Sequence, residues 1–201
     1  MRSTHVLGGT AVSCYGRAMD STTVLRWAEL EAMAWKNGGG STRNVAAAPA
    51  GSGPAHFDWR VSIAEVAADG PFSAFPGVDR VIMLIDGPEM ALDVDGVTHR
   101  LERFDVLAFS GEATTLCRVP SGPTRDLNLM TRRDRATGAV HRVDVAGEYR
   151  AAVGDGEVLL FVALSPGLDG LGTLDSVMRD GAGQLAVTGT GTVAEIRIRL
   201  T

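Results

Sequence analysis

The sequence predicts an all-β protein, either a β-sandwich or a β-barrel. Short apolar or alternating segments recur about every 8–15 residues, and Gly, Pro and Asp residues separate them. The chain contains 25 glycines, which suits many tight turns, and it shows little helical periodicity. Its 201 residues, 45% of them hydrophobic, can bury a core in one large domain or in two small fused β-lobes.

The first clear strand covers residues 57–66, where apolar and polar residues alternate. Because the side-chain period of a strand is two, one face is expected to carry Phe57, Trp59, Val61 and Ile63, and the other Asp58, Arg60, Ser62 and Ala64. Further strands are expected at 80–85, 89–94, 97–101, 104–109, 114–119, 126–131, 140–145, 158–164, 184–187 and 192–200.

Two Asp-Gly dipeptides, at 86–87 and 95–96, are hairpin-turn signals. Residues 24–34 and 171–179 are each expected to form a short helix. The sequence shows no tandem repeat and does not by itself reveal a two-lobe arrangement.

Residues 1–20 lack any period and are rich in Gly, Ser and Thr, so we expect a disordered N-terminal extension there. Residues 21–201 are expected to form a single compact body, and the start codon is either Met1 or Met19. Cys14 and Cys117 lack metal-site spacing and are expected to be free thiols. No apolar run approaches the roughly 20 residues of a membrane helix, so the expected compartment is the cytoplasm and no membrane partner is expected.

The overall charge argues against a nucleic-acid partner. The net charge is −5 and the pI is near 5.3, whereas phosphate binding requires a basic face. The four histidines, His5, His56, His99 and His141, form no metal-binding motif, so no metal or cofactor is expected. The chain also lacks a nucleophile elbow, a catalytic cysteine signature and a dinucleotide fingerprint.

The first candidate site is the segment WKNGGGSTR at 35–43. Its glycines permit close approach of backbone N–H groups to a ligand, and Lys36 and Arg43 flank them with positive charge. Lys36 is the only lysine among 19 basic residues, as if a compact ammonium group were required. Asn37 and Thr42 add hydrogen-bonding groups, so the segment could hold a small carboxylate. The alternative is an ordinary glycine turn.

Three other segments carry candidate groups. Arg60 and Ser62 share a strand face, which points either into a barrel lumen, where the guanidinium could pair with a carboxylate, or to solvent. The loop GPFSAFPGVDR at 70–80 is either a pocket wall or a well-packed turn. In the strand DLNLM at 126–130, Asp126, Asn128 and Met130 lie opposite two leucines, so they face a pocket or water.

Three blocks together resemble the HutD/Ves family. They are WKNGGGSTR (35–43), FDWRVSIAEVAADGPFSAFPGVDR (57–80) and DLNLMTRR (126–133), and their order and spacing also fit. The resemblance covers roughly residues 22–200 and is weakest over 134–201. It implies a bicupin, meaning two cupin-type (RmlC-like jelly-roll) β-barrels fused in one body, without metal-ligating histidines.

The resemblance also implies a set of ligand-binding positions but no catalytic residue. These positions are Lys36, Asn37, Gly39, Thr42, Arg43, Arg60, Ser62, Phe75, Asp79, Arg80, Asp126 and Asn128. One departure is Asn44, which stands where an acidic residue is expected after the Thr-Arg pair, and this removes a charge partner for Arg43.

The favoured function is a non-catalytic regulator of histidine utilisation or amino-acid catabolism. The resemblance implies that it senses a small anionic metabolite such as N-formylglutamate or urocanate. One alternative is a metal-free cupin isomerase or epimerase, with Asp126, Asp79 or a histidine as its base. Another is an interaction module that restrains a transcription factor. The sequence leaves open a homodimer and a regulatory-protein partner.

Overall fold

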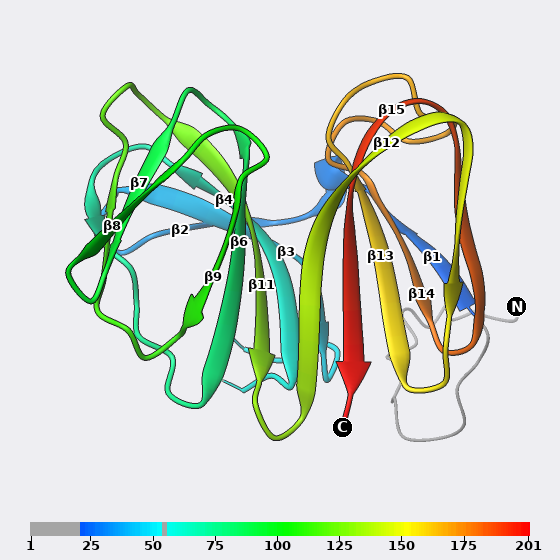
Figure 1. The fold of residues 1–201 in the computed structure, drawn as a ribbon, viewed down its shortest axis with the longest axis horizontal. Coiled ribbons are helices and arrows are strands. Elements are labelled where there is room, and N and C mark those ends of the chain that lie inside the picture. Colours follow the sequence, from blue (N-terminus) through cyan, green and yellow to red (C-terminus); the bar gives the residue numbers. More distant parts are fainter. Residues whose placement is uncertain (1–20, 54–55) are drawn as a thin grey trace, which may run out of the picture.

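Two β-lobes lie side by side in the computed structural model of the chain, which describes residues 21–53 and 56–201 (Figure 1). The N-terminal lobe combines a six-stranded and a four-stranded sheet, and the C-terminal lobe is built on a five-stranded sheet. The predicted all-β class is therefore confirmed, and so are the two lobes that the resemblance implies. The extension expected at 1–20 lies outside the described residues.

All strand pairs within the three sheets are antiparallel. In sheet order, the six-stranded sheet consists of β2 (Ala32–Ala34), β3 (Gly40–Ala48), β4 (Trp59–Val66), β11 (Thr124–Arg132), β6 (Val78–Asp86) and β9 (Val106–Ser110). The four-stranded sheet consists of β5 (Gly70–Pro71), β10 (Thr115–Arg118), β7 (Met90–Val94) and β8 (Val97–Leu101). The five-stranded sheet consists of β1 (Ser21–Leu25), β14 (Ser176–Asp180), β13 (Glu157–Ala163), β15 (Gly183–Leu200) and β12 (Ala136–Val153).

A shared apolar core joins the lobes. Val61, Ile63 and Leu129 from the six-stranded sheet belong to the same buried cluster as Leu160 and Ile196 from the five-stranded sheet. Since neighbouring residues of a strand point to opposite sides, the other face of the six-stranded sheet is directed away from the C-terminal lobe. That face packs partly against the four-stranded sheet and carries the polar residues described below.

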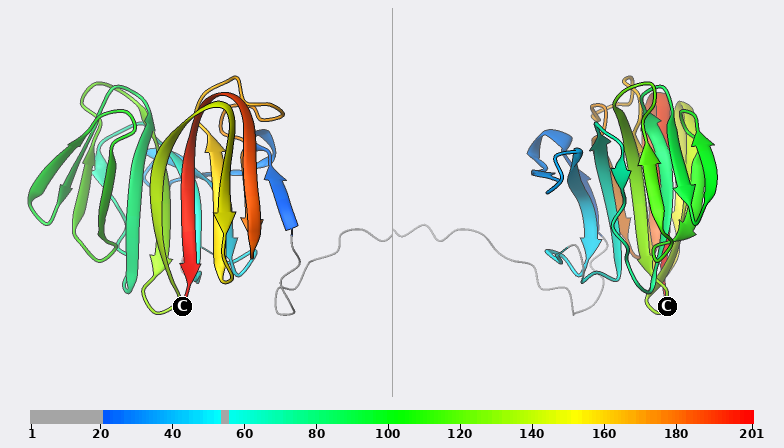
Figure 2. Two further views of the ribbon diagram at one scale, coloured as in Figure 1. Left: turned by 45° about the vertical axis from the view of Figure 1, so that its right-hand side comes forward. Right: turned by 90° about the vertical axis from the view of Figure 1, so that its left-hand side faces the viewer.

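The long strands β12 and β15 arch over to enclose the C-terminal lobe (Figure 2, left). They pair along their whole length, and Gly147 lies opposite Gly189 in the middle of the pairing. Both glycines have positive φ, at 95° and 113°, and a Cβ on Gly189 would lie 2.3 Å from the carbonyl oxygen of Gly167. The bend therefore requires glycine at position 189. Beneath it, Leu159 and Phe161 anchor a second apolar cluster.

The segment before β3 passes from one lobe to the other (Figure 1). Strand β1 pairs with β14 in the C-terminal lobe, whereas β2 pairs with β3 in the N-terminal lobe. Between them, Asp175 accepts hydrogen bonds from the Trp27 backbone N–H at 2.9 Å and from Arg26 at 2.7 Å. This anchor fixes the start of the segment that forms one wall of the pocket.

Several sequence predictions about local structure are wrong. The helix expected at 24–34 is instead the end of β1, a 3-10 turn at Trp27–Glu29 and the strand β2. The helix expected at 171–179 is a loop that runs into β14. In both segments, pairing with neighbouring strands overrides weak helical propensity. Asp86-Gly87 is a corner between two sheets, since β6 and β7 do not pair, whereas Asp95-Gly96 does close the β7–β8 hairpin with positive φ at both residues.

Phe57 is a further correction. It lies before the first residue of β4, so the alternation does not extend to it, and it packs with Val78 and Met130 instead of sharing the face of Trp59. None of the helical turns in the described ranges has the length and hydrophobicity needed to span a bilayer.

Candidate functional site

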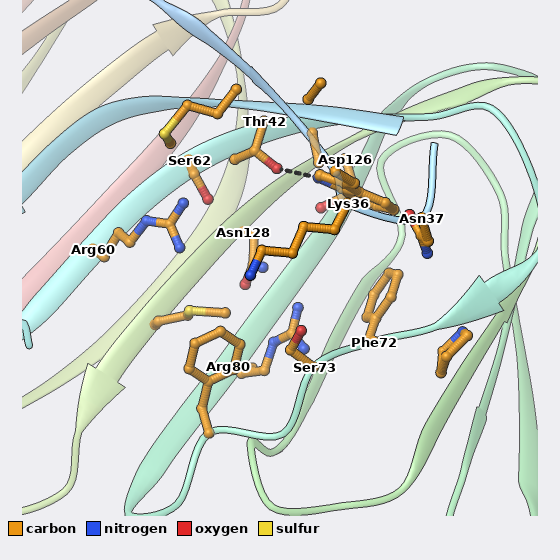
Figure 3. Close-up of a pocket in the computed structure, with 17 residues that line it drawn as sticks. Lys36, Asn37, Thr42, Arg60, Ser62, Phe72, Ser73, Arg80, Asp126 and Asn128 are labelled. Carbon is orange, nitrogen blue, oxygen red and sulfur yellow. Dashed lines mark hydrogen bonds between the residues drawn. The ribbon is translucent and has the colours of Figure 1, made fainter. Parts of the chain in front are cut away.

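A cavity of about 700 Å³ opens on the outer face of the six-stranded sheet in the N-terminal lobe (Figure 3). Its volume falls within the roughly 300–1,000 Å³ typical of small-molecule sites. Nine of the twelve predicted site residues line it: Lys36, Asn37, Thr42, Arg60, Ser62, Phe75, Arg80, Asp126 and Asn128. The glycine-rich segment, the Arg60 strand and the Asn128 strand therefore meet at one cavity, although binding by these residues stays a prediction.

Strand register explains why these side chains converge. On the pocket face of β11, Met130 lies between Arg60 of β4 and Arg80 of β6. The next pocket-facing position, Asn128, is paired with Ser62, and the one after it, Asp126, is paired with Ala64. Rows of paired residues thus follow one another across the floor of the pocket, with the arginines at one end and the carboxyl group at the other.

The two pocket arginines are buried, and neither forms an ion pair with a described carboxylate. Arg60 and Arg80 are 7% and 5% exposed. Within the described part of the chain, no carboxylate oxygen lies within the 4.0 Å of an ion pair from either guanidinium group. The Nε of Arg60 donates to Oδ1 of Asn44 at 2.5 Å, whereas the Nε of Arg80 is buried and has no hydrogen-bond partner in ranges 21–53 and 56–201.

Aromatic rings surround the Arg80 guanidinium. Its central carbon lies 5.0, 5.1 and 5.8 Å from the ring centroids of Phe72, Phe109 and Phe75. Ring faces attract a cation, yet they leave its N–H groups without acceptors. Burial lowers the pKa of Arg80 to about 10, so the group keeps its charge at neutral pH, and the charge of Asp126 opposes this lowering. An oxygen atom of a bound ligand would supply a hydrogen-bond acceptor for the Arg80 guanidinium group.

Asp126 is the carboxyl group of the pocket. It is 1% exposed, and its Oδ2 has no hydrogen-bond partner among the described residues. Burial raises the pKa of Asp126 to about 7, and the charge of Arg80 limits this rise. Near neutral pH the pocket therefore holds two buried cations and one carboxyl group that is only partly ionised.

The segment after β2 forms the wall opposite the sheet. Lys36 extends over the pocket toward Asn128 (Figure 3). Trp35 donates from its Nε1 to the Thr42 hydroxyl at 2.8 Å and meets the ring of Phe72 edge-on at 6.3 Å. Asn37 accepts a hydrogen bond from the Gly39 N–H at 3.0 Å, which stabilises the turn that carries Lys36.

Three predicted site residues lie outside the lining. Arg43 follows Thr42 in β3 and therefore points to the opposite face, where its guanidinium stacks over Trp27 at 4.3 Å. Asp79 precedes Arg80 in the same way and forms an exposed ion pair with Arg133 at 2.8 Å. Gly39 acts within the turn, where its carbonyl oxygen accepts hydrogen bonds from the N–H groups of Ala67 and Ala68.

Sequence reasoning missed the contribution of Asn44 to the site. A bulge after Asn44 sets its register opposite Ser62 and brings its amide to Arg60. Trp35, Phe72 and Ser73 also line the cavity from loops. They lie in segments 35–43 and 70–80, which the sequence marked as candidates without singling out these three residues. The aromatic residues of segment 70–80 were the one available signal.

The C-terminal lobe offers an internal comparison. Glu195 and Arg197 lie on the same face of β15 as Val193 and form an ion pair at 3.2 Å. Glu157 forms ion pairs with Arg197 at 3.3 Å and with Arg199 at 2.8 Å. The partly buried charges there neutralise one another. In the N-terminal lobe, by contrast, the buried guanidinium groups of Arg60 and Arg80 form no ion pair with another described residue.

Metal-binding groups are scarce in this part of the protein. No set of three His, Cys, Asp or Glu side chains within the described ranges is arranged to hold an ion. The three described histidines, His56, His99 and His141, are not among the residues that line the cavity. Cys117 is a buried free thiol on β10 whose pKa burial raises to about 12, so it is neutral.

Comparison with known proteins identifies the family. A sequence profile described as HutD matches residues 27–193. The chain belongs to the HutD family. This HutD-family chain is 35% identical to the solved structure of HutD from Pseudomonas fluorescens SBW25, with a TM-score of 0.79 over 90% of this chain and 100% of that one. The cupin-type double-barrel fold implied by the resemblance is thereby confirmed.

Two curated relatives extend the comparison. The first, described as an uncharacterized 21.2 kDa protein in the hutC 3′ region of Pseudomonas putida, is 38% identical over 148 residues, or 73% of this chain and 76% of that protein. The second, Protein Ves of Citrobacter koseri, is 42% identical over 112 residues. The match to Ves spans 55% of this chain and only 58% of the length of Ves.

Proposed function

We propose that this protein binds a small carboxylate metabolite in the N-terminal pocket and acts as a non-catalytic sensor in amino-acid catabolism, with histidine utilisation as the favoured pathway. The observation that carries the proposal is the pair of buried guanidinium groups, Arg60 and Arg80, which form no ion pair with any carboxylate among the described residues. Burying a cation without a partner is costly, so a site that retains two of them is suited to an anion supplied from outside. A relative located in the hutC 3′ region supports the choice of pathway.

The expected affinity suits a sensor. A hydrogen bond to a charged group contributes roughly 1.5–3 kcal/mol. Two or three such contacts, after the costs of association, correspond to binding in about the micromolar-to-millimolar range. Intracellular metabolites often vary within that range, so occupancy of the pocket would follow their concentration.

The proposal is tested by a thermal-shift screen with histidine, urocanate, imidazolone propionate, formylglutamate and glutamate, followed by calorimetry. A ligand at 100 times its dissociation constant should stabilise the protein by about 2.7 kcal/mol. Arg60→Ala should weaken binding at least about tenfold, because one charge-assisted contact is lost. Arg43→Ala is the matched control, since Arg43 lies in the same sheet but stacks on Trp27 outside the pocket. An unchanged affinity in Arg60→Ala would rule out the site.

One observation favours a second candidate function, a metal-free isomerase or epimerase. Asp126 has a pKa raised by burial to about 7 and lies in the same pocket, and a general base works best near the operating pH. The other bases considered, Asp79 and the described histidines, lie outside the lining. Turnover of a bound acid that disappears in Asp126→Asn, with binding retained, would favour this function over a sensor.

A further inference from the structure

The pocket floor is polarised along the strands. Along the pocket face of β11, Met130 lies in one row with Arg60 of β4 and Arg80 of β6, and the next two positions on that face are Asn128 and Asp126. Pocket-facing residues of one strand are about 7 Å apart, since each residue advances roughly 3.3 Å. The backbone positions of the arginine row and Asp126 are thus roughly 13 Å apart, and their side chains reach closer, since the charges of Arg80 and Asp126 affect each other's pKa. The floor therefore changes from cationic, through neutral and polar, to a carboxyl group.

The far end of this floor presents unused acceptors. The Oδ2 atom of Asp126 and the Oδ1 atom of Asn128 are both buried, and neither has a hydrogen-bond partner among the described residues. Buried polar atoms in native proteins nearly always have a partner. Both residues line the cavity, so the missing donor can come from its contents. A ligand held by the arginines could supply that donor at its other end.

The charged and titratable groups around Asp126 determine which ligand end it accepts. Arg80 of β6 favours its ionised form. Cys117 of β10 lies close enough for the charges of Asp126 and of Asp69, in the loop before β5, to raise its pKa. Arg60 lowers the pKa of Arg80 by charge repulsion, and Lys36 covers the pocket from the opposite wall. Burial outweighs the attraction of Arg80 and raises the pKa of Asp126 to about 7. Above that pH the carboxylate accepts hydrogen bonds and repels anions; below it, the acid can donate to an anion.

We propose, building on the carboxylate-binding function above, that Asp126 is the specificity-determining residue of the pocket. It selects acids that carry an N–H or O–H donor at the end opposite their carboxylate, and it discriminates against dicarboxylates. A donor end would satisfy the unused oxygen of Asp126. A second carboxylate would instead meet a like charge in a buried site, which is unfavourable.

The test is calorimetric titration with two matched pairs of acids, glutarate against glutaramate and succinate against succinamate. Within each pair, a carboxylate is replaced by a carboxamide of nearly the same shape. At pH 8 the wild-type protein should bind the amides about tenfold more tightly or better, a factor equivalent to about 1.4 kcal/mol. This preference should shrink at pH 6. It should be nearly lost in Asp126→Asn at both pH values and retained in Asp79→Asn, a matched exposed control outside the pocket.

The outcomes separate this inference from the function on which it rests. Equal affinity for acid and amide at pH 8, with both still weakened by Arg60→Ala, overturns the role of Asp126 and leaves carboxylate binding intact. Failure of all four compounds to bind the wild-type protein contradicts both. The comparison of pH 6 with pH 8 uses only the wild-type chain, so it decides the question even if Asp126→Asn does not fold.

Discussion

Substitution of Asn44 by aspartate provides a sharp test of the pocket electrostatics. Oδ1 of Asn44 accepts a hydrogen bond from Nε of Arg60 at 2.5 Å, and aspartate has nearly the same shape. The change keeps this acceptor and adds a negative charge beside the guanidinium group. Arg60 would then have a resident counterion, as the arginines of the C-terminal lobe have, and would be less available to a ligand.

The magnitude follows from the distances. Two unit charges 4 Å apart interact by about 4 kcal/mol at an effective dielectric constant of 20. A carboxylate bound to Arg60 would lie somewhat farther than this from the introduced charge, and position 44 is only half-buried. A repulsion of about 1–3 kcal/mol remains, which corresponds to a loss of affinity of roughly 5- to 150-fold.

The assay is isothermal titration calorimetry at fixed ionic strength with the tightest carboxylate from the thermal-shift screen. Gln184→Glu is the control, because it makes the same isosteric change of charge at an exposed position of the C-terminal lobe. Asn44→Asp should lose affinity while Gln184→Glu keeps that of the wild type. Equal affinities in all three proteins would refute the idea that free positive charge at Arg60 drives binding.

Three further predictions concern stability. Because folding raises the pKa of Asp126 from 3.8 to about 7, protonation of Asp126 favours the native state. The free energy of unfolding should therefore fall by roughly 1 kcal/mol per pH unit as the pH rises from 5 to 7. Chemical denaturation of Asp126→Asn should show a weaker dependence on pH, and an equal slope would contradict the assignment. Glu157 has its pKa lowered to about 2, chiefly by its hydrogen bond from Arg199, so Glu157→Gln should lower the melting temperature at pH 7 by an amount that disappears as the pH falls from 4.5 toward 2; a difference independent of pH would exclude an ionic contribution. Gly189→Ala should destabilise by about 2 kcal/mol or more, since its Cβ would overlap the Gly167 carbonyl oxygen and its φ is positive; urea unfolding that matches the wild type would show that the bend tolerates a side chain.

Much of the pocket could be predicted because it is built on strands. The alternation along 57–66 and 126–130 places Arg60, Ser62, Asp126 and Asn128 on faces opposite the apolar core, and the structure brings those faces together. The same rule explains the misplaced residues. Arg43 and Asp79 lie in the motif blocks of the family resemblance, but each is adjacent to a pocket residue in its strand and must therefore point away.

Features that depend on pairing between strands far apart in the chain could not be predicted from the amino-acid sequence. The enclosure of the C-terminal lobe requires Gly147 and Gly189 to meet across two strands, and nothing local marks either glycine as a bend. The contact between Asn44 and Arg60 depends on a bulge in β3. The two-lobe arrangement was available only through the family resemblance, because the lobes share no sequence repeat.

The most direct test of a carboxylate site on Arg60 and Arg80 is a crystal structure of the protein with a carboxylate from the screen bound. We predict that the carboxylate oxygens lie within hydrogen-bond distance of both guanidinium groups in the N-terminal pocket. A ligand bound in the C-terminal lobe, or a pocket in which Arg80 pairs directly with Asp126 and the carboxylate is absent, would contradict it.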